Sequence, residues 1–315
     1  MSDHPILLVD GNNLIARNNY VFSQAQTPEG FPIGGIFGAI KQVRNFAAAN
    51  PVSSIVFALD AGLPAFRRQV CPEYKGQRSA ERDPEAERMH ARYRQQVDAC
   101  HHLLKPLGVV TARAPDWEGD DTIAALAFGR FVDREVVVYS SDRDFNQLIT
   151  PDDRVRFYDI NSANWAVYDP DFMLKRCLDP KDSDNLDGVP GIGNKKADAL
   201  FDAFRDAHIG IKIDTQTLEG LESFLVWCTA TASAGQHKLF KLCAKVTESQ
   251  QKVRANFQCT NLRAIVPQVV PALKFRRTVP DKAAFKVACD TYHLRSLLEE
   301  LSSLWPVFDR LVCPV

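Results

Sequence analysis

Apolar residues in the first half of the chain are gathered into short, unbroken runs that end at polar or turn residues. The clearest runs lie at residues 6–9, 55–59 and 136–139. A short apolar run bounded by turn residues predicts a strand buried on both faces. Longer amphipathic stretches between the runs predict helices at residues 34–49, 85–104 and 119–131. This alternation predicts an α/β fold with a mainly parallel central sheet flanked by helices.

The pattern changes after about residue 170, where strand-like runs fade and helical periodicity dominates. Predicted helices in this part span residues 195–205, 218–229 and 283–301. We therefore expect an α/β catalytic domain at 1–175 and a helical, DNA-binding region at 176–315. Residues 63–95 begin with an irregular, charged segment within the first domain, and long irregular insertions of this kind are usually functional.

Composition narrows the protein class. The chain has 315 residues, of which 45% are hydrophobic and 24% are charged, and this excludes a disordered or fibrous protein. No apolar run is long enough for a membrane span, so we expect a cytoplasmic protein with no membrane partner. The eight cysteines include no C-x-x-C pair, which indicates reduced thiols rather than a zinc site.

Charge is balanced overall but unevenly distributed. The formal net charge is −1, and this sum alone predicts no affinity for nucleic acid. Basic residues nevertheless outnumber acidic ones in segments 67–94 and 238–254, so a polyanion could find positive surfaces. His101 and His102 fall outside every motif, and we interpret them as structural or surface residues.

Acidic residues follow the predicted strands. Asp10, Asp60 and Asp142 each come at the end of a strand, where open α/β sheets bind ligands. Further carboxylates occur nearby in the sequence, at Glu118, Asp120, Asp121 and Asp144. Singly, each has an ordinary structural alternative, because Asp-Gly is a common turn pair and acidic residues suit a helix N-terminus.

As a set, these carboxylates would repel one another in one cleft without a cation. An all-oxygen cluster selects a hard ion such as Mg²⁺ or Mn²⁺. Two such ions would clamp the attacking and leaving oxygens of a phosphoryl displacement. The sequence therefore predicts metal-dependent phosphodiester hydrolysis.

Several ordered motifs resemble the 5′-3′ exonuclease and flap endonuclease family, which includes the 5′-nuclease domain of bacterial DNA polymerase I and bacteriophage 5′-nucleases. The motifs are Leu8-Val9-Asp10-Gly11-Asn12, Ala58-Leu59-Asp60, Tyr74-Lys75-Gly76-Gln77-Arg78, Glu118-Gly119-Asp120-Asp121, Ser141-Asp142-Arg143-Asp144 and Gly188-Val189-Pro190-Gly191-Ile192-Gly193. The resemblance extends over nearly the whole chain. It implies a PIN-like nuclease core and a C-terminal helix-3-turn-helix region.

The resemblance also implies two metal sites. The first would use Asp10, Asp60, Glu118, Asp120 and Asp121, and the second would use Asp142, Asp144 and Asp184. The family has a further Asp where this chain has Lys181, and a protonated Lys cannot bind a cation. We therefore expect a weakened or rearranged second site, with Asp182 or Asp187 as candidates to compensate.

Basic and glycine-rich motifs imply contacts with DNA. The resemblance places the segment at 63–95 in a helical arch, where Lys75 and Arg78 would act on the scissile phosphate and Arg67 would contact DNA. It also places a helix-hairpin-helix element at about 184–205, which would grip duplex DNA and could hold K⁺ on its carbonyls. Its predicted DNA-binding residues are Gly188, Gly191, Gly193, Lys195 and Lys196.

The expected function is a 5′-3′ exonuclease and structure-specific 5′-flap endonuclease acting in replication or repair. Its substrates would be DNA with 5′ ends, flaps or nicks, with RNA–DNA hybrids as a further candidate. We expect a monomer that works beside a separate DNA polymerase. Two alternatives stay open: a DNA-structure-binding protein with weak catalysis, and a PIN-like ribonuclease.

Overall fold

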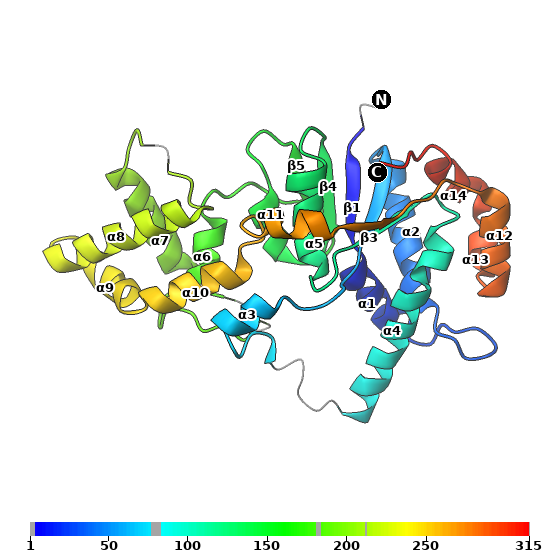
Figure 1. Cartoon of the computed structure of the whole chain (residues 1–315), viewed down its shortest axis with the longest axis horizontal. Helices are drawn as coiled ribbons and strands as arrows, with labels where there is room; N and C mark the ends of the chain where they lie inside the picture. The colour runs from blue at the N-terminus through cyan, green and yellow to red at the C-terminus, as the bar shows by residue number, and fades with distance from the viewer. Residues whose placement is uncertain (1–3, 77–82, 181–183, 212, 315) are drawn as a thin grey trace. The chain divides into compact units, whose positions relative to one another are not determined.

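The computed structural model describes residues 4–76, 83–180, 184–211 and 213–314. These residues form two compact units, each of which is described by itself. The first unit combines Met1–Gly62, Glu81–Val167 and Val266–Val315, and the second combines Leu63–Ala80 and Tyr168–Ile265. Figure 1 shows the sheet of the first unit and the helices of the second.

A seven-stranded sheet forms the centre of the first unit, in the order β6-β5-β4-β1-β2-β3-β7. The four pairings among β5, β4, β1, β2 and β3 are parallel, and the two edge strands β6 and β7 are antiparallel to their neighbours. The strands are β1 (Ile6–Asp10), β2 (Ser54–Ala58), β3 (Val110–Arg113), β4 (Val136–Ser140), β5 (Val155–Asp159), β6 (Asn164–Trp165) and β7 (Lys274–Arg276). The predicted α/β class is confirmed.

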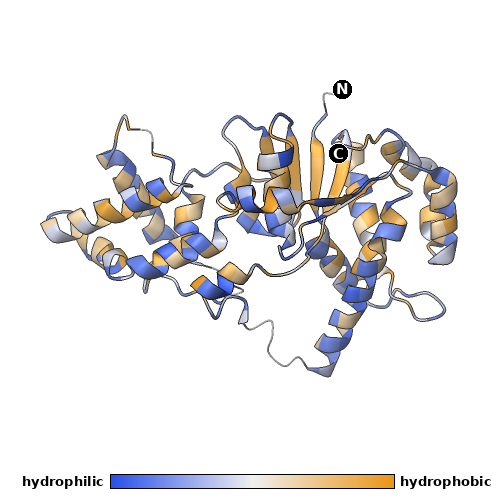
Figure 2. Ribbon diagram, viewed as in Figure 1, coloured by the Kyte–Doolittle hydropathy of each residue, from blue (hydrophilic) through white to orange (hydrophobic). Residues whose placement is uncertain are grey.

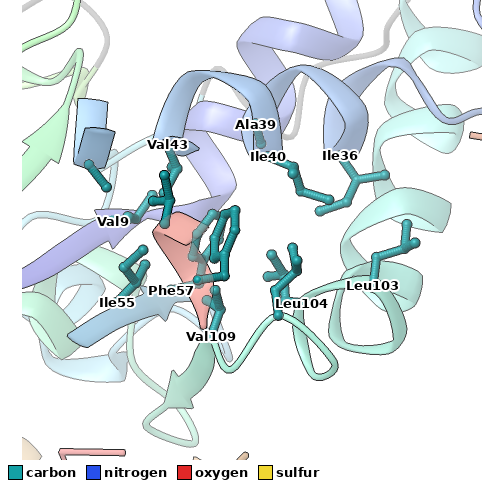
Figure 3. Close-up of a cluster of buried hydrophobic side chains, with 14 of the residues drawn as sticks. Val9, Ile36, Ala39, Ile40, Val43, Ile55, Phe57, Leu103, Leu104 and Val109 are labelled. Atoms are coloured by element: carbon teal, nitrogen blue, oxygen red, sulfur yellow. The ribbon is translucent and has the colours of Figure 1, made fainter. Parts of the chain in front are cut away.

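The inner strands are buried because helices cover both faces of the sheet, and Figure 2 shows these strands as the most apolar part of the unit. On one face, Val9 and Phe57 pack against Ile40 of α2 and Leu104 of α4 (Figure 3). Helix α5 contacts β1 and β2 as well. This two-sided burial explains the unbroken apolar runs in the sequence.

Helices of the first unit begin with local signals that the sequence carries. Asp83 caps α4 by accepting from the Ala86 amide at 2.8 Å, and Pro84 fills the first helical position, where no amide is needed. The helical segments of this unit are α1 (Gly11–Val21), α2 (Gly34–Ala49), α4 (Pro84–Leu104), α5 (Gly119–Ala125), η2 (Leu126–Arg130), η3 (Arg143–Leu148), α11 (Val266–Val269), η5 (Val270–Ala272), α12 (Lys282–Thr291), α13 (Arg295–Glu299) and α14 (Leu301–Phe308).

The second unit is helical and has an aromatic core. Phe201, Phe204 and Phe224 are buried together, with ring centroids 4.5 Å apart for the first and third and 5.5 Å apart for the second and third. Its helices are α3 (Ala65–Val70), α6 (Phe172–Leu178), α7 (Asn194–Ala207), α8 (Leu218–Ala234), α9 (Phe240–Glu248) and α10 (Gln250–Thr260).

Two sequence-based boundaries differ from the structure. Residues 266–315 belong to the first unit rather than to the region predicted at 176–315, because β7 pairs with β3 and the helices that follow join the core of the sheet. The predicted helix at 283–301 is broken, since His293 has a left-handed backbone with φ 53°. No helix in the described part of the chain has the length and apolarity that crossing a bilayer requires.

Candidate active site

Asp10 lies at the carboxyl end of the central strand β1, with β2 on one side and β4 on the other. It caps α1 by accepting from the Asn13 amide at 3.1 Å, and its other oxygen accepts from the Ser140 hydroxyl at 2.8 Å. The same Ser140 oxygen accepts from the Asp142 amide at 3.0 Å. One serine at the end of β4 therefore joins two of the predicted metal ligands.

Burial is the main influence on the pKa of Asp10, which is 8% exposed. Burial raises the pKa of Asp10 to about 7, while the Ser140 and Asn13 hydrogen bonds lower it and the charges of Asp60 and Asp142 raise it. A nearby cation would reverse the repulsion from Asp60 and Asp142. The group is therefore suited to a bound positive charge.

Asp60 follows β2 and is fixed by main-chain and amide contacts. Its carboxylate accepts from the Gly119 amide at 2.7 Å, and its own amide donates to the Asn12 side chain at 2.9 Å. The Asn12 amide nitrogen also donates to the Tyr93 hydroxyl of α4. A Cβ at Gly119 would lie 2.9 Å from the Asp60 carboxylate, so a larger residue at this position would displace that carboxylate.

A compact carboxylate group opens α5. One oxygen from each of Glu118, Asp120 and Asp121 lies within 4.8 Å of the others, which is close enough to share one ion. Asp121 is fully buried and accepts from the Glu118 amide at 3.1 Å, so it also stabilises the start of the helix. The oxygen-only donor set fits a hard divalent cation.

Asp142 and Asp144 begin the short helix η3 after β4. The Asp142 carboxylate accepts from the Asp144 amide at 2.9 Å, and both side chains are partly exposed. Asp159 ends the neighbouring strand β5, opposite Ser140 in the register, and the sequence argument missed it. Its carboxylate accepts from Asn161 and Ser162 in the next turn, so its contacts are those of a turn-stabilising residue.

Asp184 belongs to the second unit and is paired with a cation of the chain. Its carboxylate lies 2.6 Å from the Arg176 guanidinium, and both side chains are buried. Asp187 is exposed and lies 3.1 Å from the Lys252 ammonium. Lys181 and Asp182 lie outside the described residues. The use of Asp184 as a metal ligand stays a prediction.

Arg67 and Lys75, the predicted basic residues of the predicted arch segment that the structure describes, are both buried, and Lys75 is 8% exposed. Arg67 is 1% exposed and donates to the Cys259 carbonyl at 2.9 Å, so its expected contact with DNA is wrong: the guanidinium ties α3 to α10. Lys75 has a left-handed backbone, and its amide donates to the Asp184 carbonyl. The Lys75 ammonium lies 5.1 Å from the Tyr74 ring centre. Arg78 lies outside the described residues.

The glycine-rich segment forms a tight turn before α7. Gly191 has φ 73°, a conformation that favours glycine, and Gly193 precedes the first helical residue. The carbonyl of Gly191 accepts from the Lys196 ammonium at 2.7 Å, and that of Pro190 accepts from Lys245 at 3.1 Å. Lys195 is exposed, as is Lys196.

A family model described as the 5′-3′ exonuclease, N-terminal resolvase-like domain matches residues 5–177, which is more than half of the chain. The chain belongs to the 5′-3′ exonuclease family. The match covers Asp10, Asp60, Glu118 and Asp142, whose carboxylates lie at the carboxyl ends of strands or at the start of α5. The protein is a nuclease, and its acidic group supports metal dependence.

Individual relatives agree with the family match. A 5′-3′ exonuclease of Buchnera aphidicola subsp. Schizaphis graminum is 29% identical over 79% of this chain and 86% of the relative. DNA polymerase I of Mycobacterium bovis is 28% identical over 61% of this chain, but only 22% of the polymerase is covered.

Solved structures share the fold. A bacteriophage T5 5′-exonuclease with bound zinc ions has a TM-score of 0.65 and 19% identity, with 93% of this chain and 98% of that chain covered. Another bacteriophage T5 flap endonuclease structure, a complex with DNA and metal ions, has a TM-score of 0.62 and 19% identity, with 85% of this chain and 92% of that chain covered.

The nuclease positions its carboxylates with residues that the sequence argument did not single out. Asn12, Asn13, Tyr93 and Ser140 are ordinary polar residues, and only their contacts in the fold connect them to the site. One signal was available, since Asn12 and Asn13 directly follow Asp10 in the turn from strand to helix. Tyr93 lies far away in the sequence and gave no such signal.

Proposed function

We propose that this nuclease hydrolyses phosphodiester bonds of DNA at free 5′ ends and 5′ flaps. The proposal depends mainly on Ser140, which contacts the Asp10 carboxylate and the Asp142 backbone amide at the carboxyl ends of β1 and β4. All three residues lie in the part of the chain that matches the family. The DNA in the bacteriophage T5 flap endonuclease complex supports DNA as the substrate class.

The first metal site would be held by Asp10, Asp60, Glu118, Asp120 and Asp121. The second would be held by Asp142 and Asp144, with Asp184 as the remaining candidate. Bound divalent ions would make water a better nucleophile and offset the charge of the phosphate. We propose Mg²⁺ or Mn²⁺ because every donor is a carboxylate oxygen.

The chain's own residues would set the geometry of this reaction. Ser140 donates to the Asp10 carboxylate and accepts from the Asp142 backbone amide, and the Gly119 amide donates to the Asp60 carboxylate. Lys75 and Arg78 would orient the scissile phosphate and stabilise the charge that develops on it. Lys195, with the amides near Gly188, Gly191 and Gly193, would contact the backbone of duplex DNA without reading its sequence.

Potassium at the hairpin would meet internal competitors. The carbonyls of Pro190 and Gly191 already accept hydrogen bonds from Lys245 and Lys196. A K⁺ ion that binds there must displace these ammonium groups. DNA affinity in potassium and in lithium buffers should therefore differ little, and a large loss in lithium would favour a bound K⁺.

The experiment that tests the function is incubation of labelled 5′-flap, nicked and blunt duplexes with Mg²⁺, Mn²⁺ or EDTA. Cleavage near the flap junction and short products from 5′ ends, both absent in EDTA, are the expected result. DNA binding without cleavage would favour the structure-binding alternative. Preferential cleavage of RNA would favour the PIN-like ribonuclease, and an RNA–DNA hybrid tests the wider substrate range.

Two further parts of the proposal concern partners. We propose that the nuclease is monomeric and that it acts with a DNA polymerase, because its relatives include a DNA polymerase I. Sedimentation at several protein concentrations tests the first part. Stimulation of gap filling by added polymerase tests the second.

A further inference from the structure

A basic pocket lies in the first unit on the edge of the sheet, outside the carboxylate group. It has a volume of about 280 Å³ and is lined by residues of β3, β7 and the end of α4. Leu59 and Ala61 also line it, and these are the two chain neighbours of Asp60. The pocket therefore adjoins the segment that carries a predicted metal ligand.

Three cations face this pocket because of the register between β3 and β7. Arg113 is opposite Lys274, and Thr111 is opposite Arg276, so these four side chains share one face of the antiparallel pair. Like charges placed directly opposite each other destabilise a sheet. The pairing of Arg113 with Lys274 therefore has an energetic cost that the fold alone does not explain.

No acidic side chain lines the pocket, and among the described residues Arg113, Lys274 and Arg276 form no ion pair. Lys274 and Arg276 are exposed, and Arg113 is partly exposed. Burial and the neighbouring positive charges, first Arg276, lower the pKa of His101 to about 4. His101 lines the pocket, and its Nδ1 atom lies 3.3 Å from the Thr111 hydroxyl. Because its pKa is lowered, the ring is neutral at pH 7.

Further cations follow these residues in the chain. A second pocket of about 720 Å³ is lined by His102, Lys105 and Arg277, and also by the acidic Asp281. The first three side chains are exposed. The phosphates of a nucleic-acid backbone are natural ligands for the three cations of the first pocket.

We propose that Arg113, Lys274 and Arg276 bind internal phosphates of the substrate DNA strand, next to the Asp60 segment. Bound phosphates would offset the repulsion between Arg113 and Lys274. The contacts would be to the backbone and would carry no sequence preference. This site is separate from the hairpin and from the arch, and it rests on the proposed function because it assumes a DNA substrate.

The test is DNA binding in EDTA, where no cleavage occurs, by the full-length protein carrying R113Q and K274Q together. A labelled 5′-flap duplex is titrated at salt concentrations from about 50 to 200 mM. We expect Kd to rise about 10-fold or more at low salt, and the slope of log Kd against log salt to fall by about 2, since each lost phosphate contact lowers it by about 0.9. The matched control is K282Q with K286Q, which removes two positive charges from α12 of the same unit.

Stability provides an independent measurement. Removing the opposed charges should leave the melting temperature of the R113Q/K274Q protein at or above that of the wild type. The single variant R276Q should lower the salt slope by about 0.9. The single variant R113K should bind DNA with the wild-type Kd, because it keeps the positive charge. These two variants keep the proposal testable if the double variant folds poorly.

Equal Kd and salt slope in the R113Q/K274Q protein and its control would overturn the proposal. Displacement of the DNA from this site by a 5′-mononucleotide would also overturn it, because the site would then select a terminal phosphate. Failure of the proposed function is distinct: absence of cleavage on every substrate leaves the binding result intact. If the R113Q/K274Q protein binds and cleaves DNA normally, only the proposed role of the basic pocket is ruled out.

Discussion

The strand-end carboxylates of the first unit differ in their partners from a set of acidic side chains in the second unit, although ion pairs such as Glu300 with Lys41 and Arg44 occur in the first unit as well. In the first unit, Asp10 accepts from a hydroxyl and a backbone amide, and Asp60 accepts from a backbone amide. In the second unit, acidic side chains pair with cations of the chain, at Asp171–Arg205, Asp184–Arg176, Asp187–Lys252 and Glu222–Arg254. A neutral donor orients a carboxylate and leaves its charge in place, whereas an ion pair offsets that charge.

This difference separates two roles for the same residue types. A carboxylate that neutral donors orient among other carboxylates is suited to an external cation, which would favour its charged form. A carboxylate buried with an arginine contributes to the fold, and its loss leaves an uncompensated charge. The comparison therefore predicts opposite results for substitutions in the two units.

The largest effect is expected for Asp142→Ala in the first unit. Loss of a metal ligand should lower cleavage by about 1000-fold or more, because removal of one strong electrostatic contributor costs about that much. Folding should be nearly unchanged, since Asp142 is partly exposed. Cleavage rates on a 5′-flap duplex, with circular dichroism as the folding control, test this. Wild-type activity in this variant would remove Asp142 from the metal site.

The second effect concerns stability and uses Asp184→Ala. The buried Arg176 would lose its ion pair with Asp184, so the free energy of unfolding should fall by about 3–5 kcal/mol. Urea denaturation measures this loss. The double variant Arg176→Met with Asp184→Leu is the matched control, and it should recover most of the stability because both buried charges are gone. If Asp184→Ala melts like the wild type but loses activity, Asp184 serves a metal instead.

A third effect uses pH to test whether ionisation of the Asp10 carboxyl destabilises the metal-free protein. Below pH 3.8 its carboxyl is protonated in both the folded and the unfolded chain, and between pH 3.8 and about 7 only the unfolded chain ionises. The stabilising contribution of the protonated group is therefore lost as pH rises to about 7. Metal-free Asp10→Asn should then be more stable than the wild type by about 2–4 kcal/mol at pH 8, but not at pH 3.5.

Urea titrations of both proteins at the two pH values, in EDTA, provide this measurement. Addition of Mg²⁺ should stabilise the wild type and leave Asp10→Asn unchanged, because the amide cannot replace the charged ligand. Equal stability of the two proteins at pH 8 in EDTA would contradict the raised pKa that burial, with the charges of Asp60 and Asp142, gives to Asp10.

The sequence predicted the inner part of the first unit well. The apolar runs at β1, β2 and β4 are unbroken because both sheet faces are covered, and the acidic residues after them are adjacent in the chain to the strands that position them. The strands β3, β5, β6 and β7 were missed. β5 alternates between buried and partly exposed residues, and β7 has only three residues with exposed ends, so neither shows a run.

Long-range contacts set the limits of prediction for the site. Arg67 has the charge of a DNA-binding residue, but its partner Cys259 comes 192 positions later, so the sequence could not indicate its burial. Tyr93 contacts Asn12 from α4, 81 positions away in the sequence. The basic pocket depends on the antiparallel pairing of β7 with β3, which places Lys274 opposite Arg113 across more than half of the chain.

The smallest effect is expected for Ser140→Ala, which changes the orientation of the carboxylates without removing their charge. Loss of the hydroxyl removes a hydrogen bond that lowers the pKa of Asp10, so more Mg²⁺ and a higher pH should be needed for half-maximal activity. We expect a loss of about 10-fold in kcat and about 1 kcal/mol in stability. Ser54→Ala is the matched control, because Ser54 is also buried and donates to the Val312 carbonyl at 2.7 Å, at the opposite end of its strand from Asp60. If both variants lose the same stability and only Ser140→Ala loses activity, Ser140 has a positioning role. If the pH profile of activity shifts in neither variant, the neutral donors of the first unit are only structural.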